Sequence, residues 1–373
     1  MRIVLFTECY RPIQNGVVAA VEALTFALRA LGHEVLCVTP TMPGYHEANA
    51  FVVRIPSLPL PTPSAYRLTL PLLSQRRVAP MMRRPSVVHA HSPFVTGWLG
   101  FRTARRYGVP LVFTYHTRLE DYTHYVPFET RATKRVVSSL TRTYANAADA
   151  VIVPTQAMES YLRDLGVTSR IEIVPSGIDV DLFASGRRRA DVRARFGVTE
   201  AQRMVLCVGR LGREKNLELA LQTIAALPSE VRLVIIGDGP HSVALRAAAL
   251  RGGVADRVHF ALELPRAQLP DVYASADAFL FTSTSETQGL VLAEALAAGL
   301  PVVAVDTAQT REVLGEAGSV VAAGPEALAH ALRAALAGGI RGDAHAARRF
   351  ERMRIAEQVV AVYDSLLSAR AVG

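Results

Sequence analysis

Apolar residues of this chain occur in short, nearly continuous runs that are separated by amphipathic stretches. Residues 2–8 and 34–40 form two such runs, and residues 17–31 between them carry apolar side chains at helical spacing, up to Gly32. A continuous apolar run predicts a strand buried on both faces, as in a parallel sheet covered by helices. This order of strand, helix and strand therefore predicts a βαβ unit. The same pattern continues with runs at 86–92, 110–117, 148–155 and 170–177.

A second series of the same kind begins near residue 203. Its apolar runs lie at 203–211, 231–240, 257–264, 276–284 and 301–306. Helical patterns cover residues 216–227, a stretch from Leu290, and residues 353–369, which no strand follows. The polar, arginine-rich residues 180–202 are expected to be the crossing between two domains. The fold class is therefore α/β, with two doubly wound domains at 1–180 and 181–355.

The composition agrees with a folded two-domain protein. Of 373 residues, 50% are hydrophobic and 20% charged, enough for two sizeable cores. Cys9, Cys37 and Cys207 lie inside apolar runs without metal-ligand spacing, which predicts reduced structural thiols in a cytosolic compartment. No targeting signal and no run of 18 apolar residues is found, so we expect a protein that is soluble or bound to a membrane surface.

Basic residues are concentrated in the amino-terminal part. Residues 1–145 hold 17 Lys and Arg against 7 Asp and Glu, a net charge of +10, and the remainder has a net charge of −2. Nucleic acid or an anionic membrane surface would explain this asymmetry, and so would a solvated basic face. Nucleic-acid binding also needs stacking aromatics among the basic residues, and the aromatic segment 115–128 carries little positive charge. We therefore expect no nucleic-acid partner.

Residues with candidate chemistry follow the predicted strands, at the edge where doubly wound sheets bind ligands. In the segment 284–306, Glu286 lies in a loop, Gly289 closes it, and a helix begins near Leu290. The free N–H groups of that helix's first turn suit a diphosphate. Glu294 lies one turn further along, where we expect it to reach ligand hydroxyls. A structural alternative for Glu294 is that acidic residues near a helix start favour the macrodipole.

Two cations and a glycine occupy comparable positions after other strands. Arg210 and Lys215 follow the first strand of the second series and can together neutralise a leaving diphosphate. A solvated charged loop is the alternative. Gly16 lies at a helix start, where glycine lets a ligand approach the backbone closely, although an ordinary turn glycine explains it equally well.

The segment 115–128 mixes aromatic and polar residues, unlike a core strand. His116 directly follows a predicted strand and is therefore expected at the ligand-binding edge. The other candidates for an acceptor or sugar site here are Asp121, Tyr122, His124 and Tyr125. A core, capping or surface role is the alternative for each.

Several other chemistries lack their motifs. His89 and His91 have no further ligands at metal spacing, so no zinc site is expected. The turn at 237–240 is not a Walker A loop, and neither G-x-G-x-x-G nor G-x-S-x-G is present.

Taken together, these residues resemble family 4 of the retaining glycosyltransferases, which have the GT-B fold of two Rossmann-like domains facing across a cleft. The shared motifs are NGVV, HSPF, FTYHT, VPSGID, GRLGREKN, IIGDGP and the E-x7-E pair of Glu286 and Glu294. They extend over nearly the whole chain, and the glutamate pair is the most specific of them. Within the family, FTECYRPIQNGVV, YHTRLEDYTHYV and SETQGL are similar to bacterial diacylglycerol glucosyltransferases.

The resemblance implies which residues bind the donor, beginning with its diphosphate. Arg210 and Lys215 would bind the diphosphate of a nucleotide-sugar donor. The amides of Leu290 and Val291, which follow Gly289, would hold its distal phosphate. Because these groups neutralise the diphosphate, the resemblance implies that neither a metal ion nor another cofactor is required.

The resemblance also assigns residues to the ribose, the sugar and the acceptor. Glu294 would bind the donor ribose, Glu286 would bond hydroxyls of the sugar, and His116 would lie beside it. Gly16 would let the amino-terminal loop approach the phosphate and the acceptor, although many relatives have a second glycine where this chain has Asn15. The implied reaction is front-face substitution with retention. The helix 356–371 would pack back on the domain 1–180, and the donor would bind to 181–355.

The resemblance thus implies transfer of a hexose, glucose or else galactose, from a UDP-sugar to a diacylglycerol-type lipid at the cytoplasmic membrane face. The basic amino-terminal domain would hold the acceptor and touch anionic lipid. Candidates for this contact are Arg76, Arg77, Arg83, Arg84, Arg102, Arg105 and Arg106. One alternative is a GDP-mannose-dependent mannosyltransferase acting on a phosphoinositide-like lipid. Another is a transferase for a soluble sugar, and from a different class, a non-catalytic module that binds nucleotide-sugars.

Overall fold

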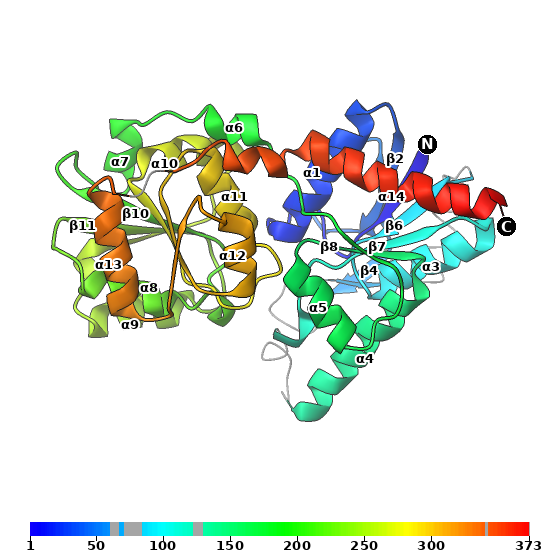
Figure 1. The fold of residues 1–373 in the computed structure, drawn as a ribbon, viewed down its shortest axis with the longest axis horizontal. Helices are drawn as coiled ribbons and strands as arrows, with labels where there is room; N and C mark the ends of the chain where they lie inside the picture. Colours follow the sequence, from blue (N-terminus) through cyan, green and yellow to red (C-terminus); the bar gives the residue numbers. More distant parts are fainter. Residues whose placement is uncertain (60–66, 71–83, 122–129, 340–341, 373) are drawn as a thin grey trace. The chain divides into compact units, whose positions relative to one another are not determined.

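The computed structural model describes residues 1–59, 67–70, 84–121, 130–339 and 342–372 (Figure 1). The chain forms two compact units, one of Met1–Gly177 with Arg352–Gly373 and one of Ile178–Glu351. It crosses between them at 177–178 and 351–352, a few residues before the boundaries at 180–181 and 355–356 that the sequence pattern predicted. No helix within the described ranges is both long and apolar enough to span a bilayer.

The first unit contains a seven-stranded parallel sheet with the order β3-β2-β1-β6-β7-β8-β9. Its strands are β1 (Arg2–Phe6), β2 (Glu34–Pro40), β3 (Val52–Ile55), β6 (Val87–Ala90), β7 (Leu111–Thr114), β8 (Ala150–Val153) and β9 (Ile171–Ile173). A short antiparallel pair, β4 (Ser57–Pro59) and β5 (Arg67–Thr69), accompanies it. Each strand of the parallel sheet except β3 coincides with a predicted apolar run.

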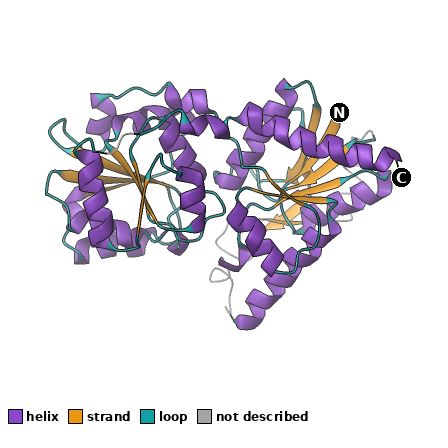
Figure 2. Ribbon diagram, viewed as in Figure 1, coloured by secondary structure: helices purple, strands orange, loops and turns teal. Residues whose placement is uncertain are grey.

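Helices cover both faces of this sheet (Figure 2). Helices α1 (Gly16–Ala30) and α14 (Arg352–Val372) lie on one face, and α3 (Val95–Tyr107), α4 (Arg131–Ala147) and α5 (Gln156–Asp164) lie on the other. Within β1, Leu5 packs towards α1 and α14, whereas Phe6 packs towards α3, α4 and α5. Both faces of the strand are therefore buried, as its continuous apolar run predicts.

The second unit repeats this architecture with six parallel strands in the order β12-β11-β10-β13-β14-β15. They are β10 (Arg203–Val208), β11 (Val231–Ile236), β12 (Val258–Ala261), β13 (Ala278–Phe281), β14 (Val302–Val305) and β15 (Ser319–Val321). The helices are α6 (Val180–Ala184), α7 (Ala190–Arg195), α8 (Leu217–Ala225), α9 (Ser242–Arg251), α10 (Leu269–Ser275), α11 (Leu290–Ala297), α12 (Ala308–Leu314) and α13 (Pro325–Leu336). Short 3-10 turns are η2 (Arg213–Lys215), η3 (Ala255–Arg257), η4 (Arg266–Gln268) and η5 (Ala346–Phe350). Its two core layers bury both faces of the sheet.

Each sheet reverses its strand order at one point. In the first sheet the reversal lies between β1 and β6, and in the second it lies between β10 and β13. Ligands of open α/β sheets bind beyond the carboxyl ends of the strands at such a switch point. The loops that follow these four strands are therefore the places to look for a site.

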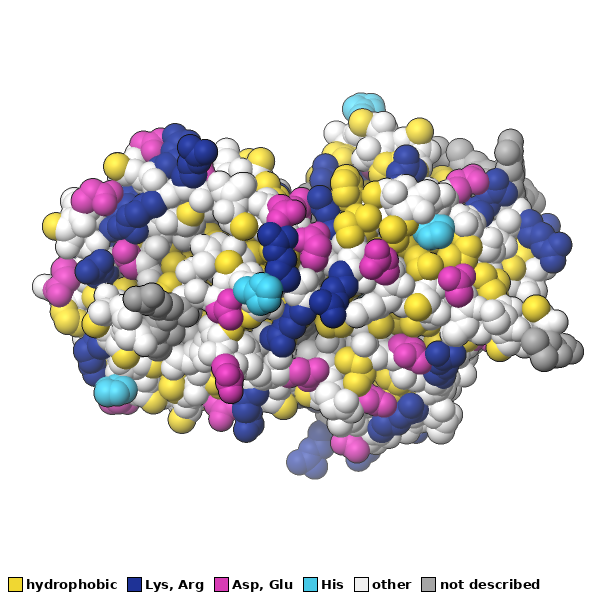
Figure 3. All heavy atoms as spheres, turned by 45° about the horizontal axis from the view of Figure 1, so that its top comes forward, with side chains coloured by type: hydrophobic (Ala, Val, Ile, Leu, Met, Phe, Trp, Pro, Cys, Tyr) yellow, Lys and Arg dark blue, Asp and Glu magenta, His cyan; other side chains and the backbone are white. Residues whose placement is uncertain are grey.

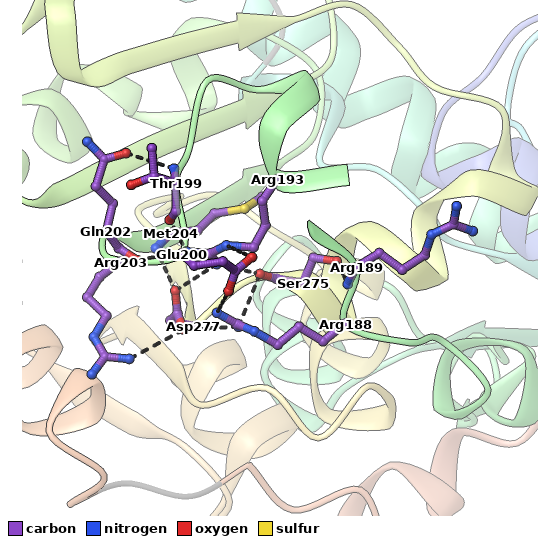
Figure 4. A network of polar contacts seen from close by, with 10 residues as sticks. All are labelled: Arg188, Arg189, Arg193, Thr199, Glu200, Gln202, Arg203, Met204, Ser275 and Asp277. Carbon is purple, nitrogen blue, oxygen red and sulfur yellow. Dashed lines mark hydrogen bonds and ion pairs between the residues drawn. The ribbon is translucent and has the colours of Figure 1, made fainter. Parts of the chain in front are cut away.

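The arginine-rich segment 180–202 is not the crossing that the sequence analysis expected, because it folds onto the second unit. Arg193 is 0% exposed and its guanidinium donates to the carboxylate of Asp277 (3.1 Å) and to the carbonyl of Gln202 (2.7 Å) (Figure 4). Arg188 reaches the other oxygen of the same carboxylate at 3.1 Å. An arginine in a short polar stretch can thus bind buried groups within a domain, and does not by itself indicate a linker.

Candidate active site

At the switch point of the second sheet, the end of β13 holds the loop that follows β10. The hydroxyl of Thr282 donates to the carbonyl of Lys215 (2.8 Å), and that of Ser283 donates to the carbonyl of Glu214 (3.0 Å). These bonds fix the backbone around Lys215. Its ammonium then meets the carboxylate of Glu286, from the loop after β13. The structure therefore brings Lys215 and Glu286 together, as two sequence-predicted site residues.

Arg210 is held by an acid that the sequence analysis did not single out. The guanidinium lies 3.4 Å from the carboxylate of Glu214, whose side chain is 2% exposed, while the Arg210 side chain is 39% exposed. The turn after β11 supports this loop from behind, because Leu211 N–H donates to the carbonyl of Asp238 (2.9 Å). Gly237 is required there, since a Cβ would lie 2.0 Å from the carbonyl oxygen of Gly209.

Helix α11 begins at the same edge of the sheet. Gly289 precedes it with φ +82°, in the left-handed region that glycine adopts readily. No side chain caps the helix, and the amides of Leu290 and Val291 are the first two of the helix, where no carbonyl of a preceding helical turn can accept from them. Together with the helix dipole, they form a site suited to an anion.

Glu294 lies inside the unit rather than reaching outward. It is 4% exposed, and its two oxygens accept from the hydroxyl of Tyr273 (2.9 Å) and from the guanidinium of Arg266 (3.1 Å). Burial raises the pKa of this carboxyl, and Arg266 and Tyr273 oppose that rise. Neither partner stands near Glu294 in the sequence, so only the fold identifies them.

In the first unit, an acid that the sequence analysis did not single out joins the two strands of the switch point. Glu8 follows β1, and its carboxylate accepts from the hydroxyl (2.5 Å) and the backbone N–H (3.1 Å) of Thr96, at the start of α3. Ser92 and Thr69 add longer contacts at 3.4 and 3.3 Å. Burial raises the pKa of Glu8, while these hydrogen bonds lower it. The sequence signal that could have identified Glu8 is its position at the end of the first predicted strand. Phe94, the N-cap residue of α3, makes no side-chain hydrogen bond to the helix, and Glu8 accepts from the N–H of Thr96 instead.

Three histidines line the neighbouring strands. His91 follows β6 and His116 follows β7, and Nδ1 of His91 lies 2.9 Å from Nε2 of His116. His89, inside β6, is held between Tyr363 and Thr114 at 2.6 Å each. Burial lowers the pKa of His89 to about 3 and that of His116 to about 4, and lowers the pKa of His91 well below its usual value. All three are therefore neutral at pH 7.

Gly16 begins α1, and Asn15 caps that helix by accepting from the N–H of Val18 (2.9 Å). A Cβ at Gly16 would meet no atom within 4 Å, and its φ is not in the left-handed region. The fold itself therefore does not require glycine at this position.

Of the expected acceptor-side residues, the structure describes one. The carboxylate of Asp121 lies 3.3 Å from the guanidinium of Arg118, which in turn lies over the ring of Tyr161. Tyr122, His124 and Tyr125 lie outside the described residues. Within the described part of the chain, no three His, Cys, Asp or Glu side chains come together as a possible metal site.

Comparison with known proteins places this geometry in a family. Residues 14–182 match the model of Glycosyltransferase Family 4, and residues 188–352 match that of the glycosyl transferases group 1. Two alpha-monoglucosyldiacylglycerol synthases are similar to the chain. That of Streptococcus pneumoniae is 31% identical over 82% of this chain and 71% of its own length, and that of Acholeplasma laidlawii is 32% identical over 81% and 80%.

A third relative covers all of the chain. It is the GDP-mannose-dependent alpha-(1-6)-phosphatidylinositol dimannoside mannosyltransferase of Mycobacterium tuberculosis, 31% identical over 100% of this chain and 97% of its own length.

Solved structures share the fold. Sucrose-phosphate synthase from Thermosynechococcus elongatus superposes with a TM-score of 0.78 at 24% identity, covering 99% of both chains. The Anabaena protein HepE in complex with UDP-glucose gives a TM-score of 0.77 at 20% identity, covering 98% of this chain and 100% of that one. The matches to both units and the relatives above 30% identity establish that the chain belongs to glycosyltransferase family 4, with the GT-B fold.

Proposed function

We propose that the protein transfers glucose from UDP-glucose to a diacylglycerol-type lipid, with retention at the anomeric carbon. The two relatives named as glucosyldiacylglycerol synthases support the hexose and the acceptor. HepE, crystallised with UDP-glucose, supports a UDP-sugar as the donor. The observation that carries the proposal is the pairing of Lys215 with Glu286 over the switch point, at the edge where α11 begins.

The second unit supplies the positive charge that a nucleoside diphosphate needs. Arg210 and Lys215 follow β10, and the first-turn amides of Leu290 and Val291 add the positive end of a helix dipole. Such fixed charges stabilise the charge that develops on the leaving diphosphate. We propose that they do so without a metal ion or another cofactor.

Glu286 suits a role in binding sugar hydroxyls better than a role as a nucleophile. A glycosidase-type nucleophile works with a second carboxylate that flanks the same bond, and Glu294 is occupied by Tyr273 and Arg266. In the proposed step, the acceptor hydroxyl attacks from the face that the diphosphate leaves. The bond from the anomeric carbon to the diphosphate breaks as the glycosidic bond forms, and the hydroxyl proton passes to the leaving oxygen.

The first unit supplies Gly16 and His116 in this proposal. The open space in front of Gly16 supports close approach of donor phosphate or acceptor to the start of α1. The neutral His116 offers a hydrogen bond to a hydroxyl of the donor sugar.

Helix α4 is the described element that best supports contact with an anionic membrane. Its first two turns carry Arg131, Lys134 and Arg135, all exposed, and no acidic residue lies in the first turn. Positive charge at a helix amino terminus is opposed by the dipole, so helix stability alone does not account for it. On the face drawn in Figure 3, basic and acidic side chains are interspersed.

The arginines of α3 have a simpler explanation. Arg105 and Arg106 lie in its last turn, where the dipole favours cations, and each also lies over a neighbouring aromatic ring. Arg76, Arg77 and Arg83, which were also candidates for lipid contact, lie outside the described residues.

A second candidate has a specific observation in its favour. The mannosyltransferase relative aligns with the entire chain at 31% identity. This supports, as the alternative, transfer of mannose from GDP-mannose to a phosphoinositide-like lipid.

The test is release of nucleoside diphosphate from UDP- and GDP-sugars, with and without diacylglycerol in anionic vesicles. We expect UDP release from UDP-glucose that rises with diacylglycerol, an α-linked product by NMR, and no loss of rate with a chelator. Turnover of GDP-mannose on phosphoinositide vesicles alone would replace the proposal with the second candidate. Nucleotide binding without turnover of any donor would contradict both.

A further inference from the structure

His91 is the histidine of this edge for which neither the fold nor the proposed reaction gives a use. Its backbone N–H donates to the carbonyl of Phe6 (2.8 Å), which fixes it beside β1. Its ring lies between those of His89 and His116, with centroid distances of 4.2 and 5.2 Å. The side chain is 4% exposed, so packing holds the ring in one orientation.

The hydrogen bond between His91 and His116 has a direction that burial determines. Both rings are neutral, so one nitrogen of the pair donates and the other accepts. If His116 Nε2–H donated to His91 Nδ1, the second nitrogen of His91 would carry a hydrogen. That atom, Nε2, is buried and has no hydrogen-bond partner among the described residues. An orphaned buried N–H is rarer in proteins than an acceptor left unsatisfied.

We propose that His91 is a positioning residue for His116: its Nδ1–H donates to His116 Nε2 and so fixes His116 as the tautomer that carries its hydrogen on Nδ1. The geometry that carries this is the 2.9 Å bond together with the buried Nε2 of His91.

This tautomer determines what His116 can do. Its Nε2 is occupied as an acceptor, so the ring serves through Nδ1–H as a hydrogen-bond donor and not as a general base. That a sugar hydroxyl receives this bond rests on the proposed function, whereas the tautomer itself does not. A free histidine ring rotates and exchanges between its two neutral tautomers, and the hydrogen bond with His91 fixes both the orientation and the tautomer of His116.

The experiment records long-range ¹H–¹⁵N spectra of the full-length protein with ¹⁵N-labelled histidine at pH 7.5, with His116→Gln to assign the His116 signals. The same samples are assayed for turnover of UDP-glucose. The variants are His91→Phe, which keeps a ring without the donor, and His91→Asn, whose amide nitrogen can replace Nδ1. Tyr363→Phe is the matched control, because it removes a partner of His89 and leaves the His91–His116 bond untouched.

We expect His116 to be the Nδ1–H tautomer in the wild type, in Tyr363→Phe and in His91→Asn, and to lose that state in His91→Phe. In His91→Phe, kcat should fall about ten- to a hundredfold with a smaller change in KM, as for a misplaced catalytic group, and His91→Asn should recover most of it. An Nε2–H tautomer in the wild type would overturn the proposal without any variant having to fold. So would a tautomer unchanged in His91→Phe, or a changed tautomer with undiminished kcat. The expected spectra without turnover of any donor would support the tautomer and contradict the proposed function instead.

Discussion

The ammonium of Lys215 contacts the carboxylate of Glu286, although 71 positions separate the two residues in the chain. The side chains are 22% and 16% exposed, so the pair is only partly open to solvent. It lies beyond the carboxyl ends of β10 and β13, the neighbouring strands at which the strand order reverses. Ligands of open α/β sheets bind at such a point. In the proposed function, we expect the donor diphosphate to compete with Glu286 for Lys215, which would leave the carboxylate available to sugar hydroxyls.

From this relationship we expect Glu286→Gln to separate binding from turnover. Turnover of UDP-glucose should fall by about 10²–10³, the usual effect of removing one group aimed at a transition state. Affinity for UDP, measured by calorimetry, should be unchanged or higher, because Lys215 no longer shares its charge with a carboxylate. Glu230→Gln is the control, an exposed acid just before β11 and so at the opposite edge of the sheet. Turnover of Glu286→Gln within threefold of the wild type would remove Glu286 from the reaction.

Gly16→Ala should reduce activity without harming the fold. Its Cβ would enter open space at the start of α1, and alanine in a helix is more stable than glycine by roughly 0.5–1 kcal/mol. We therefore expect an equal or higher urea midpoint, together with a loss of transfer of at least about tenfold, as for a ligand displaced by a methyl group.

The matched control for Gly16 lies at the start of another helix. A Cβ at Gly324, before α13, also meets no atom within 4 Å. Gly324→Ala should leave transfer unchanged. If Gly16→Ala retained full activity as well, Gly16 would be an ordinary turn glycine.

Arg193 should be essential for the stability of the second unit. Arg193→Met leaves the carboxylate of Asp277 and the carbonyls of Gln202 and Ser275 without their buried donor. Breaking a buried ion pair from one side costs about 3–5 kcal/mol, which should appear as a large drop in the urea midpoint. Arg188→Met, at a side chain 43% exposed and bound to the same carboxylate, should cost less than about 1 kcal/mol. An equal loss of stability in the two variants would contradict the conclusion that the buried hydrogen bonds of Arg193 stabilise the second unit.

The contrast between Arg193 and the strands shows what the sequence can and cannot predict here. Continuous apolar runs predicted every strand of the two parallel sheets except the edge strands β3 and β15. The position of Glu286 after a predicted strand placed it at the ligand-binding edge. Arg193 has the same local surroundings as a linker arginine, and only its distant partner Asp277 reveals its role. Tyr273 and Arg266 meet Glu294 for the same reason, through packing that no local pattern encodes.

The buried histidines predict instability in mild acid. Burial lowers the pKa of His89 to about 3 from a usual value of 6.5. Between these values the unfolded chain takes up a proton that the folded chain does not, so stability falls as the pH falls. One such group contributes up to about 1.4 kcal/mol per pH unit, or roughly 2.3 kcal/mol between pH 6.5 and 4.5, because the unfolded chain is already half protonated at pH 6.5.

His89→Gln tests this through the slope of stability against pH. The variant should be less stable at pH 8, because Tyr363 and Thr114 lose their fitted partner. Its free energy of unfolding should, however, decline less steeply below pH 6.5. The slope should correspond to the uptake of about one proton fewer on unfolding. An unchanged slope would show that His89 is protonated in the folded state.

Helices α3 and α4 provide a comparison of equal charge for the membrane contact. Replacing Arg131, Lys134 and Arg135 by Gln removes three cations from the start of α4, whereas replacing Arg102, Arg105 and Arg106 removes three from α3. Each cation near an anionic surface contributes about 1 kcal/mol, so the α4 variant should bind phosphatidylglycerol vesicles on the order of a hundredfold more weakly in a flotation assay.

The α3 variant should bind nearly as well as the wild type, because the helix dipole and the neighbouring rings already account for Arg105 and Arg106, two of its three arginines. If net charge alone drove binding, the two variants would lose affinity equally, and α4 would have no special place in the contact. High salt should abolish the difference between them, since exposed charges are screened within about 3 Å at 1 M ionic strength.

Removing cations from the start of α4 should also stabilise that helix slightly. Weaker vesicle binding by a protein that is no less stable would therefore locate the loss at the membrane contact and not in the fold.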